Sequence, residues 1–211
     1  MVTRRPSATQ RRLLGLLYKH QLEGHAATVK SLANSWNLDW AYTRTLCQAV
    51  EEEGLVQSNY RGYHLTDLGR SMIKVVFTGG VFDIIHPGHI HTLASSRKLG
   101  DVLVVSVARN STVIKNKGRP PTHEEAQRQE LVRSIRFVDV AVLGSEKSIF
   151  ETVEMTKPDI IALGYDQTHK ERYVVEQSHK RGIKVKVVRL KSPIPKTKSS
   201  KLVKEGATQD F

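Results

Sequence analysis

The chain has 211 residues, of which 39% are apolar, and it carries a formal net charge of +12. This length and apolar content suit one large domain or two small ones with packed cores, and they exclude disorder on a large scale. The single cysteine, Cys47, excludes an internal disulfide framework and any metal or redox site built from paired cysteines. The positive charge indicates an acidic partner, such as a nucleic acid or a nucleotide, without choosing between them.

The chain has no run of about eighteen apolar residues, and its N-terminal segment lacks the hydrophobic stretch of a secretory signal. We therefore expect a soluble, cytoplasmic protein that has no membrane partner.

Residues 1–73 predict short helices followed by a small hairpin. Asp39 is the expected N-cap of the third helix, which should end at Gly54. Two short β-like runs flank "NYRG", and "TDLGR" after them indicates the start of another helix. Apolar residues recur at helical spacing in three segments, at residues 13–17, 29–36 and 41–50.

This order of helices, tight turn and hairpin resembles the winged helix-turn-helix superfamily. The resemblance implies double-stranded DNA as a partner, with Arg44 and Gln48 of the third helix facing the major groove and Arg61 of the hairpin near phosphate. The net charge of residues 1–73 is only +3, and three glutamates follow in residues 51–53. A domain that contacts only other proteins is therefore the alternative.

From residue 74 onward, short runs rich in valine and isoleucine alternate with polar helical segments. This alternation predicts an α/β fold with a parallel sheet that is covered on both faces. The chain is thus expected to contain two domains, at residues 1–73 and 74–211. The expected strands are residues 74–79, 102–108, 139–144, 159–164 and 184–190; the expected helices follow His89 and Thr122 and cover residues 149–156 and 170–180.

The stretch "VVFTGGVFDIIHPGHIHTL", residues 75–93, combines an apolar strand with two glycines and three histidines. Gly79 and Gly80 end the first strand, where ligands gather in open α/β sheets and where backbone amides can approach a phosphate. His86 and His89 flank a proline that suits the first turn of a helix, whose N-terminus favours negative charge. This pattern predicts an anion site, with two zinc ligands or ordinary structural histidines as alternatives.

The segment "GGVFDIIHPGH" closely resembles the signature of the H-x-G-H nucleotidyltransferases, whose fold is Rossmann-like, and the similarity extends over nearly all of residues 74–204. Within that superfamily, "VARNSTVIKNKGRPP", "EEAQRQELVRSIRFVDVAVLGS" and "PDIIALGYDQ" resemble archaeal-type FAD synthase. The resemblance implies transfer of AMP from ATP to FMN, with a divalent cation, Mg²⁺ first, bound through the phosphates rather than by a protein cage. A homodimer is a further expectation.

Two other functions fit the same sequence. The second is that of a glycerol-3-phosphate cytidylyltransferase, or of an enzyme acting on a related alcohol phosphate, because that family shares several of these sequence motifs. A transcription regulator that senses a nucleotide or a flavin is the third, although the intact glycines and histidines of residues 79–89 argue against a purely sensory domain.

The resemblance also implies roles for individual residues. His86 and His89 would donate hydrogen bonds to the α-phosphate and the bridging oxygen, and Lys115 would reach a phosphate from a loop that it shares with Lys117. His91 is expected to point elsewhere on the helix. The residues expected to bind the nucleotide are Thr78, Gly79, Gly80, Phe82, Gly88, Arg128, Gly164, Asp166, Ser199 and Ser200.

Each of these roles has a plainer alternative. Lys115 would then belong to a solvated loop and Arg128 to an exposed helix surface. Gly164 and Asp166 would form an ordinary turn, and Ser199 and Ser200 would only cap a helix. Asn110 departs from the family pattern, in which an acidic residue is common, so no role in holding the acceptor or a metal is assigned to it.

Overall fold

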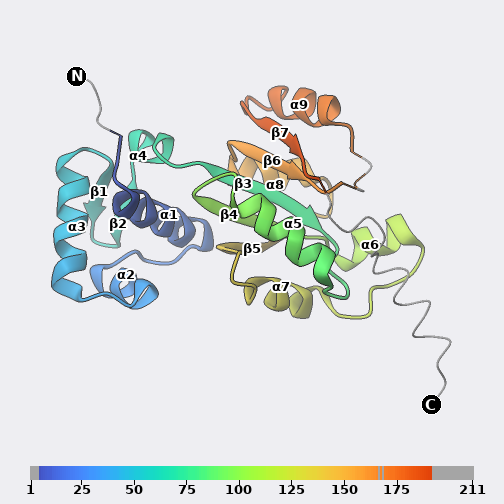
Figure 1. Cartoon of the computed structure of the whole chain (residues 1–211), viewed down its shortest axis with the longest axis horizontal. Coiled ribbons are helices and arrows are strands. Elements are labelled where there is room, and N and C mark those ends of the chain that lie inside the picture. Colours follow the sequence, from blue (N-terminus) through green and yellow to red (C-terminus); the bar gives the residue numbers. More distant parts are fainter. Residues whose placement is uncertain (1–4, 166, 168, 192–211) are drawn as a thin grey trace, which may run out of the picture. The chain divides into compact units, whose positions relative to one another are not determined.

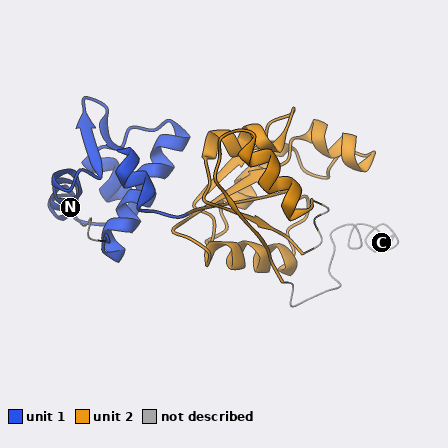
Figure 2. Ribbon diagram, turned by 90° about the horizontal axis from the view of Figure 1, so that it is seen from above, with its two compact units in different colours: residues 1–74 blue, residues 75–211 orange. Residues whose placement is uncertain are grey.

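The computed structural model describes residues 5–165, 167 and 169–191. It divides into two compact units, Met1–Lys74 and Val75–Phe211, called unit 1 and unit 2 below (Figure 2). Their boundary falls one residue from the one expected at residues 73 and 74. Within the described residues, no helix is both long and apolar enough to cross a membrane.

Unit 1 contains helices at its start, a two-stranded antiparallel hairpin and a short closing helix. Asp39 caps α3 as predicted, because its Oδ1 accepts hydrogen bonds from the N–H groups of Ala41 and Tyr42, at 2.9 and 3.0 Å. Ser7 caps α1 in a capping box with Gln10. The elements are α1 (Ala8–Glu23), α2 (Val29–Trp36), α3 (Trp40–Glu52), β1 (Val56–Asn59), β2 (Gly62–Leu65) and α4 (Asp67–Ser71).

The core of unit 1 forms where α1 packs against α3 and β2. Leu13, Leu14 and Leu17 of α1 have no exposed surface. Gly69 of α4 lies so close to the backbone of Leu55 that a Cβ atom would come within 1.9 Å of the Leu55 carbonyl oxygen. The order of elements is the one predicted, and its assignment to the winged helix-turn-helix superfamily stays a prediction.

Unit 2 contains a parallel sheet of five strands, as the sequence predicted (Figure 1). The strand order is β5-β4-β3-β6-β7, so the chain first moves outward from β3 and then returns to the other side of it. The point where the order reverses, between β3 and β6, is where open α/β sheets bind ligands. The strands are β3 (Val75–Gly80), β4 (Val102–Val107), β5 (Val140–Leu143), β6 (Ile160–Leu163) and β7 (Lys186–Arg189).

Helices cover the sheet on both faces, with α5 in front of the strands and α8 behind them in Figure 1. Helix α5 contacts β3 and β4, α7 contacts β4 and β5, and α9 contacts β7. Helix α6 was not predicted from the sequence. The helices are α5 (Pro87–Arg97), α6 (Asn110–Lys117), α7 (Glu125–Arg133), α8 (Ile149–Thr156) and α9 (Glu171–His179).

The core of unit 2 lies along the central strands and the helices next to them. Burying these side chains stabilises the unit through the hydrophobic effect. This packing fixes the ends of the strands, from which the loops of the candidate site emerge. The cluster comprises Val76, Phe82, Leu93, Leu103, Val105, Val107, Val132, Ala141, Ala162 and Leu190.

Candidate active site

The strands β3 and β6 separate toward their carboxyl ends. Backbone pairing of β3 with β4 continues as far as Gly80, whereas its pairing with β6 runs from Val76 to Phe77. Beyond Phe77, side-chain hydrogen bonds connect β3 to β6 and to the loop after it. The Thr78 hydroxyl donates to the Ala162 carbonyl at 2.8 Å, and the Gln167 side-chain amide donates to the Gly79 carbonyl at 2.7 Å. Thr78 is buried, and these two side-chain hydrogen bonds lie at the point where the strand order reverses.

His86 is the N-cap of α5, and Pro87 occupies the first turn, as the sequence predicted. The Gly88 N–H donates to Nδ1 of His86 at 3.1 Å. Because Nδ1 accepts this bond, the proton of the neutral ring must lie on Nε2. The backbone therefore prepares His86 to donate a hydrogen bond through Nε2.

The rings of His86 and His89 stack, with centroids 3.9 Å apart and an angle of 29° between their planes. Both side chains are partly exposed at the N-terminus of α5. Unpaired N–H groups and the helix dipole attract an anion there. The structure thus brings the two predicted donors together at the predicted helix start.

The ring of Phe82 packs against the ring of His89. The Phe82 ring is buried and lies 5.2 Å from the His89 ring, and the Phe82 backbone has a φ of 52°, which is uncommon for a residue other than glycine. A Cβ atom on Gly80 would come within 2.9 Å of the Phe82 ring. A side chain at position 80 would therefore require the Phe82 ring to shift, which is a second reason for glycine here besides the predicted approach of a phosphate.

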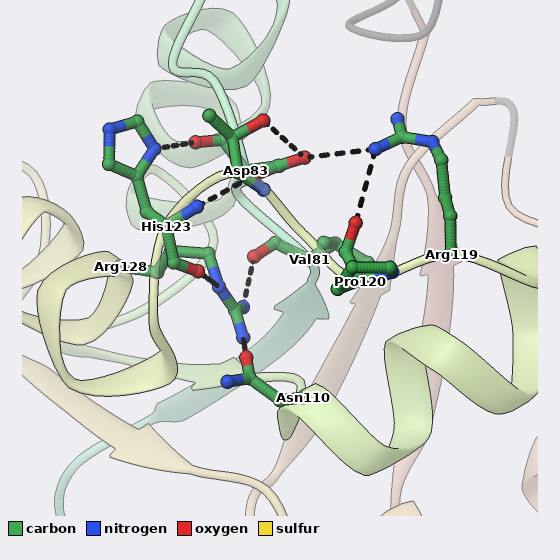
Figure 3. A network of polar contacts seen from close by, with 8 residues as sticks. Val81, Asp83, Asn110, Arg119, Pro120, His123 and Arg128 are labelled. Atoms are coloured by element: carbon green, nitrogen blue, oxygen red, sulfur yellow. Dashed lines mark hydrogen bonds and ion pairs between the residues drawn. The ribbon is translucent and has the colours of Figure 1, made fainter.

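Arg128 lies on α7, but its guanidinium points inward and has no exposed surface. The alternative of an exposed helical arginine is wrong, because its guanidinium donates four hydrogen bonds to protein oxygens. Figure 3 shows those to His123, Val81 and Asn110. Burial lowers the pKa of Arg128 below the usual value, while the charge of Asp83 opposes that effect. The direct nucleotide contact stays a prediction. The acceptors are the carbonyls of His123 (3.0 Å), Val81 (2.6 Å) and Ala108 (2.8 Å) and Oδ1 of Asn110 (2.7 Å).

Asp83, which sequence reasoning did not single out, joins the loop after β3 to residues 119–123. Its carboxylate is 4% exposed and accepts the Thr122 N–H at 2.7 Å, and it lies 3.9 Å from the Arg119 guanidinium (Figure 3). The signal was an aspartate inside the apolar run "VFDII", since a buried carboxylate needs partners. Asp83 and Arg128 together hold the loop that leads to His86.

Lys115 and Lys117 lie in the last turn of α6, so the expectation that they belong to a loop is wrong. Both side chains are exposed. The phosphate contact of Lys115 stays a prediction. Asn110, at the start of α6, donates its N–H to Glu125 and accepts from Arg128, which gives it a structural role.

The loop after β6 is held by a side chain of its own, Gln167, and by Arg189 of β7. The Gly164 N–H donates to the Gln167 side chain at 3.2 Å, and the Gly164 carbonyl accepts from Arg189 of β7 at 3.1 Å. Asp166, Ser199 and Ser200 lie outside the described residues. Among the residues that the structure describes, no three or more His, Cys, Asp and Glu side chains are grouped to hold a metal ion.

Comparison with known proteins gives consistent matches for unit 2. Residues 77–206 match the cytidylyltransferase-like family model. The FAD synthase of Aciduliprofundum boonei is 54% identical over 120 residues, which are 57% of this chain and 79% of that protein. The FAD synthase of Pyrococcus abyssi is 45% identical over 139 residues, which are 64% of this chain and 93% of that protein.

A solved structure agrees with this assignment. The crystal structure of the lipopolysaccharide core biosynthesis protein from Thermoplasma volcanium is 47% identical, with a TM-score of 0.56, and the match covers 58% of this chain and 99% of that chain. The family model spans more than half of the chain and includes His86 and His89. The chain therefore belongs to the cytidylyltransferase-like family, alongside relatives that are FAD synthases, and it is a nucleotidyltransferase.

Proposed function

We propose that the chain is an FMN adenylyltransferase, which transfers AMP from ATP to the phosphate of FMN and releases pyrophosphate. The observation that carries the proposal is the stacked pair His86 and His89 at the start of α5, beside the end of β3. The choice of ATP and FMN as substrates draws on the relatives that are FAD synthases.

In the proposed reaction, an oxygen of the FMN phosphate attacks the α-phosphorus of ATP. A new P–O bond forms while the bond from the α-phosphorus to the oxygen that bridges to the β-phosphate breaks, and pyrophosphate leaves with that electron pair. The second pKa of a phosphate monoester is about 6, so the attacking phosphate is largely a dianion at neutral pH and needs no protein base. The protein then has to align the reactants and stabilise charge.

His86 suits this task because its Nε2 carries the proton that faces away from the helix cap. His89, stacked on it, would supply the second donor. Both would act on the α-phosphate and the bridging oxygen, where negative charge grows in the transition state. A divalent cation, for which Mg²⁺ is the first candidate, would bind together with the triphosphate and be coordinated by phosphate oxygens and water.

A screen for pyrophosphate release tests the reaction and the substrates together. We expect turnover with ATP plus FMN, and FAD as the product by chromatography. The other arms combine ATP or CTP with glycerol 3-phosphate and with FMN. Turnover only with CTP and an alcohol phosphate would reject the FMN assignment and favour a cytidylyltransferase. The expected cytoplasmic location and homodimer stay predictions.

A second function, binding of duplex DNA by unit 1, is supported by its exposed cations. Arg44 and Gln48 are exposed on α3, and Arg61 is exposed between β1 and β2. The guanidinium of Arg44 lies 5.0 Å from the Trp40 ring centre, and that of Arg61 lies 5.5 Å from the Tyr60 ring centre. Stacking on exposed rings holds these cations extended at the surface.

Two of the three glutamates at the C-terminal end of α3, residues 51–53, accept hydrogen bonds within unit 1. Glu51 accepts hydrogen bonds from the Ser58 backbone at 3.0 Å and from the Ser58 hydroxyl at 2.6 Å, and Glu53 accepts one from Gln10 at 2.8 Å. These bonds turn two of the acidic side chains toward the hairpin and α1. The repulsion that they would exert on DNA is thereby reduced.

Fluorescence anisotropy of the full chain with duplex DNA at about 50 mM salt tests this second function. Arg44→Ala should weaken binding by about 1–3 kcal/mol, and Arg61→Ala should also lower the dependence on salt by about one unit of slope. Arg172→Ala, on an exposed arginine of α9, is the matched control and should leave binding unchanged. A folded chain that does not bind duplex DNA, or equal losses in all three variants, would reject DNA binding by this surface.

A further inference from the structure

Arg189 ends β7 and binds four successive acceptors around the loop that follows β6. Its Nη1 donates to the carbonyls of Gly164 at 3.1 Å and of Gln167 at 2.9 Å. Its Nη2 donates to the carbonyl of His169, and its Nε donates to the carboxylate of Glu171 at the start of α9. One guanidinium thus connects both ends of the loop at residues 164–171.

The same loop reaches across to β3 through Gln167. The Gln167 backbone is held by Arg189, while its side chain accepts the Gly164 N–H at 3.2 Å and donates to the Gly79 carbonyl at 2.7 Å. Gly79 is one of the two glycines at the end of β3. A continuous set of hydrogen bonds therefore runs from Arg189 to the strand end at which the nucleotide is expected to bind.

Lysine could not replace Arg189 in this arrangement. A guanidinium carries five N–H groups on three nitrogens in one plane, whereas an ammonium group offers its donors from a single point. A single ammonium group could not donate hydrogen bonds to all four acceptors at once. These acceptors belong to Gly164, Gln167, His169 and Glu171. Arg189 is 30% exposed and Glu171 is 46% exposed, so the loop is fixed by the geometry of these bonds rather than by burial.

We propose that Arg189 is a positioning residue for the nucleotide: it holds Gly164, Gln167 and His169 in place, with Gln167 bonded to the end of β3, so that the site is formed before the nucleotide arrives. This inference rests on the proposed function. The guanidinium of Arg189 binds three loop carbonyls and the Glu171 carboxylate, and we expect these bonds to be the same in the ground state and the transition state. Its loss should therefore weaken nucleotide binding and raise the KM for ATP without lowering kcat.

The test compares conservative variants with matched controls on the same helix. Arg172 and Glu176 form an exposed ion pair within α9, with an N–O distance of 2.9 Å. We expect Arg189→Lys to raise the KM for ATP about tenfold with kcat within twofold of wild type. Glu171→Gln should raise it less, because the three carbonyl contacts persist. Arg172→Lys and Glu176→Gln should change neither constant.

Calorimetric titration with ATP, without FMN, gives a second measure of the same effect. An equal KM and equal ATP affinity in Arg189→Lys and Arg172→Lys would overturn the proposal, as would a fall in kcat at unchanged KM. A wild-type chain that binds ATP but forms no FAD would reject the proposed function instead, and the calorimetric comparison would still test Arg189. Thermal unfolding of every variant checks that it is folded. If Arg189→Lys does not fold, the KM and ATP affinity of Glu171→Gln are compared with those of Glu176→Gln instead.

Discussion

His86 occupies a helix position at which Ser, Thr, Asp and Asn are preferred as caps. It still satisfies one backbone N–H, through Nδ1, and this bond fixes the proton on Nε2. A smaller cap would satisfy the helix equally well and would leave nothing to donate toward a phosphate. The departure from local helix preference therefore coincides with the chemical requirement of the site.

Replacing His86 or His89 by alanine should reduce kcat far more than ATP affinity. Each loss removes a donor whose bond strengthens as charge builds in the transition state, at a cost on the order of 3 kcal/mol, roughly a hundredfold or more in rate. Steady-state FAD formation measures the effect. His91→Ala should change the rate little, since His91 instead bonds Ser95 and the Lys191 carbonyl. Near-full turnover in folded His86→Ala and His89→Ala variants would contradict this mechanism.

The residues of the histidine segment were predictable because their roles depend on local spacing. A strand end, two glycines and a proline between two histidines determine where the side chains lie along the chain. Arg128 differs, because three of the four oxygens that bind its guanidinium belong to residues far away in the sequence, namely Val81, Ala108 and Asn110. Such a contact depends on residues far away in the sequence, so helical spacing alone cannot indicate it.

Among the elements, the strands of unit 2 were predictable, whereas α6 was not. The strands are short runs rich in valine, isoleucine and leucine, as is typical of a buried parallel sheet. The sequence of α6, "NSTVIKNK", contains asparagine and β-branched residues of weak helix propensity. Its first turn is stabilised from outside, since the Asn110 N–H donates to Glu125 of α7 at 2.8 Å. Tertiary contact, rather than propensity, accounts for this helix.

Glu125→Gln should destabilise unit 2 by about 1 kcal/mol at neutral pH, because it removes a charged acceptor from the N-terminus of α6. The hydrogen bond from Asn110, helped by Arg109, lowers the pKa of Glu125 below its ordinary value of 4.5. The unfolded chain takes up the proton first on acidification, so this stabilisation is present above pH 4.5 and is lost as the pH falls through the folded pKa.

Urea unfolding of wild type, Glu125→Gln and Glu130→Gln at neutral pH and near pH 4 measures this effect. Glu130 lies on the same helix and pairs with Arg133 at the surface, at 3.7 Å and with 68% of its side chain exposed, so it is the matched control. The difference between wild type and Glu125→Gln should shrink on acidification, and Glu130→Gln should behave like wild type. A difference that is the same at both pH values would show that the Glu125 charge does not support α6.

On the scale of the whole molecule, the two units differ in fold, and the family match falls within unit 2. The family match covers residues 77–206, within unit 2, and the 139 residues matched in the Pyrococcus abyssi FAD synthase are 93% of that protein. The matched segment therefore makes up nearly all of that relative. Residues 1–73 carry only +3 of the net charge of +12, so most of the positive charge lies in the part that handles nucleotides.

A fragment of residues 74–211 should therefore fold alone and keep its activity. Unit 2 has its own core, and every described residue of the candidate site, from Thr78 to Arg189, belongs to it. We expect kcat and the KM for ATP within about threefold of the full chain, measured as FAD formation after circular dichroism has shown that the fragment is folded. A folded fragment that loses more than about tenfold in kcat would show that unit 1 contributes to the site. Unchanged constants, together with DNA binding only by the full chain, would assign catalysis to unit 2 and recognition of DNA to unit 1.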